Sequence, residues 1–123
     1  MVVPGICDAV DAIGHCVRVS GPEAGEAIRV SKADITVERD AIGVIIRKTT
    51  PTSCDVQVAG IIDDIYSSLT LGWHWIALDA TLSASAPVVV PGTIDMLWSI
   101  PFGYAVASDR MLLRHMAPMG LRS

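Results

Sequence analysis

Apolar and polar residues alternate along most of this chain, with the two-residue period that is typical of β-strands. The clearest case is residues 54–59 (CDVQVA), where Cys54, Val56 and Val58 fall on one face and polar side chains fall on the other. Similar alternating or apolar runs occupy residues 15–20, 27–32, 41–47, 73–78, 102–108 and 111–116, with shorter ones at 35–38 and 88–90. The pattern predicts seven or eight short strands.

The segments between these runs have the composition of turns. Residues 21–26 (GPEAGE) separate two alternating runs and predict a hairpin, and Asp109-Arg110 suits a tight hairpin link. Gly43 interrupts an apolar run, which indicates a bulge or a close approach of another backbone. Short strands with closely spaced turns predict an all-β fold, a small β-barrel or β-sandwich.

The first residues follow a different pattern. Ile6, Val10 and Ile13 are spaced as i, i+4 and i+7, which allows one short helix of about two turns. A helix this short is marginal without tertiary contacts, so we expect an N-terminal arm that leans on a neighbour or on the barrel. The predicted organisation is an arm and first strand over residues 1–25 and a β-barrel domain over residues 26–123, together forming one folding unit.

The composition adds an expected partner. The chain has 123 residues, of which 51% are hydrophobic and only 18% charged, and its mean hydropathy is +0.50. A domain this small exposes much of its surface, so the surplus of apolar residues predicts a surface that another protein covers. The high hydrophobicity also excludes an intrinsically disordered chain.

The distribution of charge, proline and glycine argues against a nucleic-acid-binding protein and against a membrane-spanning protein. The formal net charge is −4, and there is no Lys or Arg between Thr49 and Asp109, so we expect no nucleic-acid partner. The uncharged stretches 80–94 and 96–108 are interrupted by Pro and Gly, so we expect no membrane span. The N-terminus lacks the features of a signal peptide, and we expect synthesis in the cytoplasm.

Residues with catalytic or metal-binding chemistry do not form a recognisable motif. Candidate metal ligands are Cys7, His15, Cys16, Cys54, His74 and His115, but none has the paired spacing of a zinc site, and buried free thiols explain the cysteines better. The carboxylates Asp63, Asp64, Asp79 and Asp95 suit the polar ends of strands and turns. We therefore predict no enzyme activity, no cofactor and no metal.

The string Trp73-His74-Trp75 stands out. In a strand the two tryptophans share one face, and His74 with Ile76 shares the other. Two tryptophans on one face can fill a core, anchor a protein interface or stack on a sugar ring. All three interpretations remain open from the sequence, and Trp73 and Trp75 join Ile6, Val10 and Ile13 as candidate interface residues.

The order of features from Glu26 to about Met116 resembles the small β-barrel module of tailed-bacteriophage capsid decoration (cement) proteins and of some phage fibre and tail proteins. The resemblance rests on a G-x-V/I strand at Gly43, a V-x-V-x-G strand at residues 56–60, an L-x-x-G turn at residues 69–72 before an aromatic strand, and the segment 101–108 (PFGYAVAS) in the place of the module's G-x-A-x-S strand. The tryptophan string is bulkier than the corresponding Tyr-Tyr-Leu type of string, and the first 25 residues match nothing in the module.

The resemblance implies a structural protein of the virion. Such decoration proteins have no active site or cofactor, usually form homotrimers, and bind the major capsid protein at threefold or quasi-threefold junctions of the coat. The expected location is therefore the capsid surface. A phage tail or fibre component is the alternative within the same class, and a carbohydrate-binding β module that uses Trp73 and Trp75 is the alternative from another class.

Overall fold

The computed structural model describes residues 1–37, 40–89, 96–114 and 118–122, and within them every regular element is a β-strand. The strands are β1 (Val2–Ile6), β2 (Cys16–Ala24), β3 (Ala27–Lys32), β4 (Ala41–Thr50), β5 (Ser53–Gln57), β6 (Gly60–Asp63), β7 (Gly72–Ile76), β8 (Leu82–Ser83), β9 (Met96–Ser99), β10 (Pro101–Ala107), β11 (Arg110–Leu113) and β12 (Met119–Arg122). The all-β prediction is confirmed, although the chain forms more strands than the seven or eight expected.

The first five strands close into a barrel in the order β1-β3-β2-β4-β5. β1 completes it, because it runs parallel to β3, with Gly5 beside Ile28, and antiparallel to β5, with Val2 beside Gln57. We expected an N-terminal arm that leans on a neighbour or on the barrel, whereas β1 is itself a strand of the barrel wall. Gly5 is buried in the barrel wall, where a Cβ would lie 3.0 Å from the Cys54 sulfur, so this glycine belongs to a strand and not to a helix boundary.

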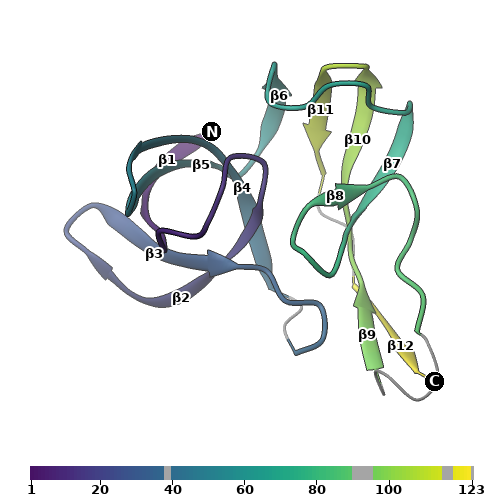
Figure 1. Ribbon diagram of the computed structural model, residues 1–123, viewed down its shortest axis with the longest axis horizontal. Coiled ribbons are helices and arrows are strands. Elements are labelled where there is room, and N and C mark those ends of the chain that lie inside the picture. Colours follow the sequence, from purple (N-terminus) through teal and green to yellow (C-terminus); the bar gives the residue numbers. More distant parts are fainter. Residues whose placement is uncertain (38–39, 90–95, 115–117, 123) are drawn as a thin grey trace.

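The rest of the chain forms a five-stranded antiparallel sheet in the order β6-β11-β10-β7-β8 and a two-stranded ribbon of β9 and β12. Figure 1 shows the barrel on one side of the molecule and this second sheet on the other, with the ribbon below the sheet. β9 leads almost directly into β10, so the ribbon extends from the sheet. The expected division at residue 25 thus differs from the architecture, in which the barrel ends with β5 at Gln57.

Two apolar clusters hold the structure together. The smaller one fills the barrel, and the larger one joins the barrel to the inner face of the second sheet. The barrel cluster consists of Cys7, Val17, Val30, Ile45, Cys54 and Val56. The joining cluster includes Cys16, Ile35 and Val44 from the barrel side and Ile62, Ile76, Phe102 and Met111 from the sheet. Because this cluster is shared, the barrel and the sheet pack as one unit, with one face of the sheet turned toward the barrel.

Several local predictions are confirmed. β2 and β3 form the hairpin expected across residues 21–26. β10 and β11 form the expected tight hairpin, but its two turn residues are Ser108 and Asp109 and not Asp109 and Arg110, because Arg110 pairs with Ala107 as the first residue of β11. At Gly43 a Cβ would clash with the backbone carbonyl of Gln57, so the glycine marks a close backbone approach.

Three expected strands differ from the structure. Residues 35–37 form a turn, and residue 38 lies outside the described residues. Val88 and Val89 belong to no strand, and Val90 lies outside the described residues. The last expected strand, residues 111–116, ends at Leu113, and residues 115–116 lie outside the described part.

Candidate functional site: the outer face of the second sheet

The second sheet has an inner face in the core and an outer face that points away from the barrel. Along β7, His74 and Ile76 are buried, while Trp73 and Trp75 are only partly buried, so the predicted division of this strand into two faces is confirmed. The tryptophans lie on the outer face and belong to neither buried apolar cluster. The core interpretation of Trp73 and Trp75 is therefore wrong, and the two surface interpretations remain.

Strand register places four apolar side chains in one row across this outer face. Ile61 of β6 lies beside Leu112 of β11, Leu112 beside Tyr104 of β10, and Tyr104 beside Trp73 of β7. Ile61 is 43% exposed and Tyr104 is 40% exposed. We call these four residues, Ile61, Leu112, Tyr104 and Trp73, the apolar row. Contiguous exposed apolar side chains on a rigid sheet are typical of a protein interaction surface.

Two arginines border the apolar row. Residues alternate between faces along β11, so Arg110 and Arg114 lie on the same side as Leu112. The Arg110 guanidinium forms an ion pair with Asp63 at 2.7 Å, and both side chains are about half exposed. Arg114 is exposed, and its side chain forms no hydrogen bond or ion pair within the described part of the chain. The row is thus an apolar strip with an Arg110–Asp63 ion pair on one side of its centre and the Arg114 cation on the other.

The other candidate interface residues lie on the barrel. Ile6 is a partly buried residue of β1, while Val10 and Ile13 are 75% and 51% exposed. The segment that carries Val10 and Ile13 is a loop, not the short helix considered from their spacing, and it folds back onto the barrel. The structure therefore separates the five candidates into two groups, one on the barrel and one on the second sheet.

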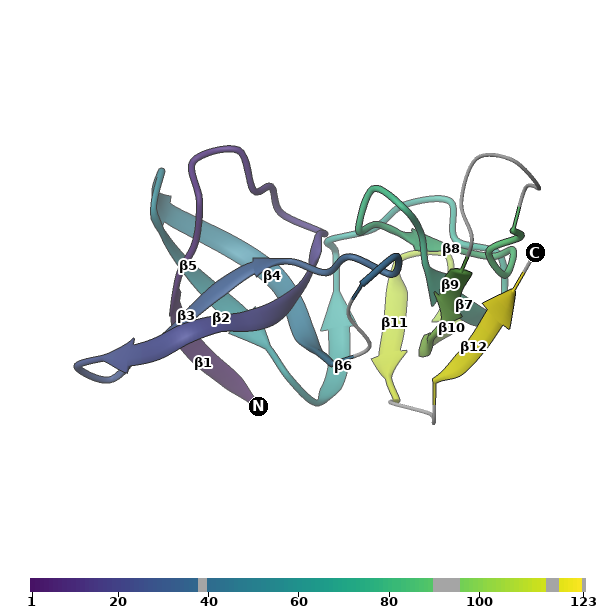
Figure 2. The same ribbon diagram turned by 90° about the horizontal axis from the view of Figure 1, so that it is seen from below.

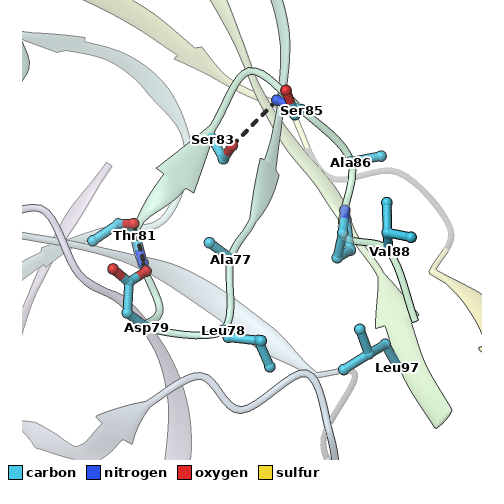
Figure 3. Close-up of a pocket in the computed structure, with 10 residues that line it drawn as sticks. Ala77, Leu78, Asp79, Thr81, Ser83, Ser85, Ala86, Val88 and Leu97 are labelled. Atoms are coloured by element: carbon cyan, nitrogen blue, oxygen red, sulfur yellow. Dashed lines mark hydrogen bonds between the residues drawn. The ribbon is translucent and has the colours of Figure 1, made fainter. Parts of the chain in front are cut away.

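A cavity of about 560 Å³ opens beside β8 (Figure 3). Its polar side chains are used in local turns: Asp79 accepts hydrogen bonds from the Thr81 N–H at 3.1 Å and the Thr81 hydroxyl at 2.6 Å, and Ser83 accepts one from the Ser85 N–H. These hydrogen bonds hold the pKa of Asp79 below its usual value. The described residues that line the cavity include no histidine, cysteine or aromatic ring, so they offer neither a nucleophile with a base nor a stacking platform.

A smaller cavity of about 210 Å³ lies where the end of β2 and β3 meets the turn at Leu78–Ala80. Arg18, Lys32, Asp34 and Asp79 line it, and the Arg18 Nε atom is buried without a hydrogen-bond partner in the described structure. The charges are balanced, with two cations and two carboxylates. The cavity therefore has no net attraction for an ion of either sign.

The three cysteines are free and buried. Cys7 and Cys54 lie together in the barrel, and burial, reinforced by hydrogen bonding to Cys7, raises the pKa of Cys54 to about 12. Burial also raises the pKa of Cys16, well above its usual value. Protonated thiols are poor nucleophiles and poor metal ligands, so these cysteines act as apolar core residues.

The remaining candidate metal ligands do not converge. Among the described residues, no group of three or more His, Cys, Asp or Glu side chains is placed to hold a metal ion. His15 accepts a hydrogen bond from the Ala12 N–H, while His74 is buried on the inner face of the sheet with its Nδ1 3.1 Å from the Gly72 carbonyl oxygen. His115 and Asp95 lie outside the described residues.

Sequence reasoning missed most of the apolar row, since Ile61, Tyr104 and Leu112 belong to segments that are far apart in the chain. Only strand pairing places them beside Trp73. The alternation of β10 and β11 does contain a signal, because Tyr104 lies between the buried residues Gly103 and Ala105, and Leu112 lies between the core residues Met111 and Leu113.

Comparison with known proteins leaves the site to be interpreted from its own geometry. No family model, curated protein or solved structure matches the chain. Within the described residues there is also no helix of the length and hydrophobicity that a membrane crossing requires.

Proposed function

We propose that this chain is a structural protein of a tailed-phage virion, a capsid decoration protein that binds the assembled coat. The observation that carries the proposal is the apolar row on the second sheet, because it is built on paired strands and lies outside the core, as an assembly contact of an oligomeric decoration protein would. An interface on a rigid sheet needs little ordering on binding, which lowers the entropic cost of association. The order of sequence features shared with phage decoration modules supports the same function.

The chemistry of the described residues favours a binding role. The polar groups of the larger cavity are occupied by their own turns, the three thiols are buried, and burial raises the pKa of Cys16 and of Cys54. The largest exposed features are instead apolar side chains at fixed positions. A decoration protein requires such surfaces, because it must associate with its own copies and with neighbouring coat subunits.

The carbohydrate-binding alternative uses Trp73 and Trp75, and glycan binding tests it. Trp73 and Tyr104 meet edge to face, with an interplanar angle of 86°, so these two rings do not form one flat surface on which a sugar ring could stack. A tail or fibre role requires the same kind of surfaces as a decoration role, and copy number separates the two: hundreds of copies per particle for a decoration protein, and a few to tens for a tail part.

Co-sedimentation with phage shells tests the proposal. The purified protein is mixed with expanded shells and, separately, with immature shells of the phage that encodes it, and the pelleted protein is quantified. We expect saturable binding to expanded shells at hundreds of copies per particle and little binding to immature shells. Equal recovery with and without shells would contradict a decoration role. Binding at a few copies would favour the tail component, and glycan binding lost on Trp73→Ala would favour the carbohydrate module.

A further inference from the structure

The loop between β1 and β2 presents a second apolar surface. Val10 and Ile13 project from it at 75% and 51% exposure. Lys48 of β4 holds the loop backbone in place. Its ammonium group donates hydrogen bonds to the Asp11 carbonyl oxygen at 2.7 Å and to the Asp8 and Ala9 carbonyl oxygens at 3.4 Å. The buried Asp11 carboxylate also accepts a bond from the Asp8 N–H at 2.8 Å. The loop, residues 8–13, therefore has a backbone held by hydrogen bonds and exposes apolar side chains.

This loop and the apolar row lie on different parts of the molecule. The loop belongs to the barrel, as Figure 2 shows, whereas the apolar row faces away from the barrel because the inner face of its sheet packs against it. One copy of the chain therefore does not cover its own apolar row with its own loop. A second copy has both surfaces available.

The dimensions of the two surfaces agree. The apolar row crosses four neighbouring strands, which are separated by three spacings of ~4.8 Å and so span about 14 Å. Val10 and Ile13 are three residues apart, a separation of at most about 10 Å. Both exposed side chains of the loop therefore fit within the length of the row, between Ile61 and Trp73.

The charges beside the two surfaces are opposite. Arg110 and Arg114 lie on either side of Leu112, but Arg110 is already paired with Asp63, so Arg114 is the cation available beside the row within the described residues. In the loop, Asp8 is exposed, and the only hydrogen bond to its carboxylate within the described structure is a long one of 3.4 Å from the Ser31 hydroxyl. The Asp8 carboxylate of one copy is therefore opposite in charge to the Arg114 guanidinium of the next.

We propose that loop 8–13 of one copy docks on the apolar row of the next copy, so that copies of this chain associate head to tail. A contact between two unlike surfaces is heterologous, and it forms a closed ring when the rotation between copies closes. This inference rests on the proposed homo-oligomeric decoration protein and assigns its subunit contact. The coat-binding surface then lies elsewhere on the ring.

Light-scattering mass measurement over a range of concentrations tests the contact. We expect a wild-type mass that is a whole multiple of the monomer, three in the proposed trimer. Val10→Asp in the loop and Leu112→Asp in the apolar row should each give folded monomers that melt cooperatively, at a lower temperature than the wild-type oligomer because association stabilises the folded state. Val88→Asp, at a residue that is 75% exposed outside both surfaces, is the matched control and should keep the wild-type mass.

Mixing the two variants distinguishes a heterologous contact from face-to-face pairing. Val10→Asp retains an intact row and Leu112→Asp retains an intact loop, so together they have one productive contact. We expect the mixture to contain a species of twice the monomer mass, which neither variant forms alone. An oligomeric Val10→Asp variant, or a mixture that stays monomeric, would overturn the proposed contact.

A charge exchange tests the ionic part of the contact. Asp8→Arg and Arg114→Asp should each weaken association about tenfold or more, and the double variant should regain most of the loss. If the double variant associates no more strongly than the single variants, Asp8 and Arg114 do not form an ion pair in the contact. A wild-type protein that is monomeric at every concentration would overturn the inference as a whole, whereas the shell experiment would still decide the proposed function independently.

Discussion

Trp73 of β7 and Tyr104 of β10 lie opposite each other in the second sheet, and their rings meet edge to face with centroids 5.5 Å apart. The contact joins neighbouring strands at the centre of the exposed outer face. It holds both rings in place before any partner binds, which reduces the side-chain ordering that an interface requires.

The aromatic contact gives a direct test by substitution. Tyr104→Ala should lower the free energy of unfolding by about 1 kcal/mol, because an edge-to-face pair adds a contribution of that size. Tyr104→Phe keeps the ring and should remain close to wild type. Urea unfolding measures both variants, and an equal loss in the two would show that the hydroxyl, not the ring contact, stabilises this face.

Gly43 is expected to be among the least tolerant glycines in the barrel. A Cβ at this position would meet the Gln57 carbonyl oxygen of the neighbouring strand, and both partners are backbone-constrained. Gly43→Ala should therefore cost about 2 kcal/mol or more. Gly21→Ala is the control, since its Cβ would meet only the flexible Arg29 side chain at 3.3 Å. Thermal unfolding of the two variants should differ clearly, and similar melting temperatures would refute the close approach.

The buried thiols should be unreactive in the folded protein. The pKa of Cys54 is about 12, so this thiol remains protonated at pH 8, and Cys7 and Cys16 are equally inaccessible. Titration with Ellman's reagent should detect almost no thiol in native protein and three per chain in guanidinium. Rapid reaction of one thiol in the native state would mean that the barrel opens at β1.

The turn that begins at Asp79 should stabilise the fold in a pH-dependent manner. Hydrogen bonds from Thr81 hold the pKa of Asp79 below its unfolded value of about 3.9. The stabilisation is therefore present above about pH 4 and is lost as the pH falls through the lower, folded pKa.

Thr81→Val removes one of these donors. We expect it to reduce stability by up to about 1 kcal/mol at pH 7, because Asp79 is largely exposed and solvent screens the interaction. The difference from wild type should shrink at pH 2.5. Urea unfolding at the two pH values measures it, and a difference that is independent of pH would assign the effect to packing.

The sequence predicted the fold class because strand alternation is a local property. It located the β2–β3 hairpin and the two faces of β7, since both depend on neighbouring residues. It did not predict that β1 closes the barrel, because that depends on parallel pairing with β3 and on a buried glycine. Apolar residues spaced at helical intervals can also occur outside a helix. Here Ile6 belongs to a strand of the barrel wall, and hydrogen bonds from Lys48 hold the segment with Val10 and Ile13 as a loop.

The candidate site could be predicted only in part. The tryptophan string identified one end of the apolar row, because adjacent aromatic residues are visible in a single segment. The other members come from β6, β10 and β11, and only the register of these strands brings them together. The pairing of a loop with a distant sheet face is likewise a property of the folded chain.

A density map of decorated phage shells tests both the decoration role and the contact between copies, because it locates the chain and its neighbours at once. We expect density for this protein on the outside of the expanded coat, at junctions between coat subunits, with the apolar row of each copy covered by loop 8–13 of the next. Shells that lack such density, or copies whose apolar row faces solvent, would contradict it.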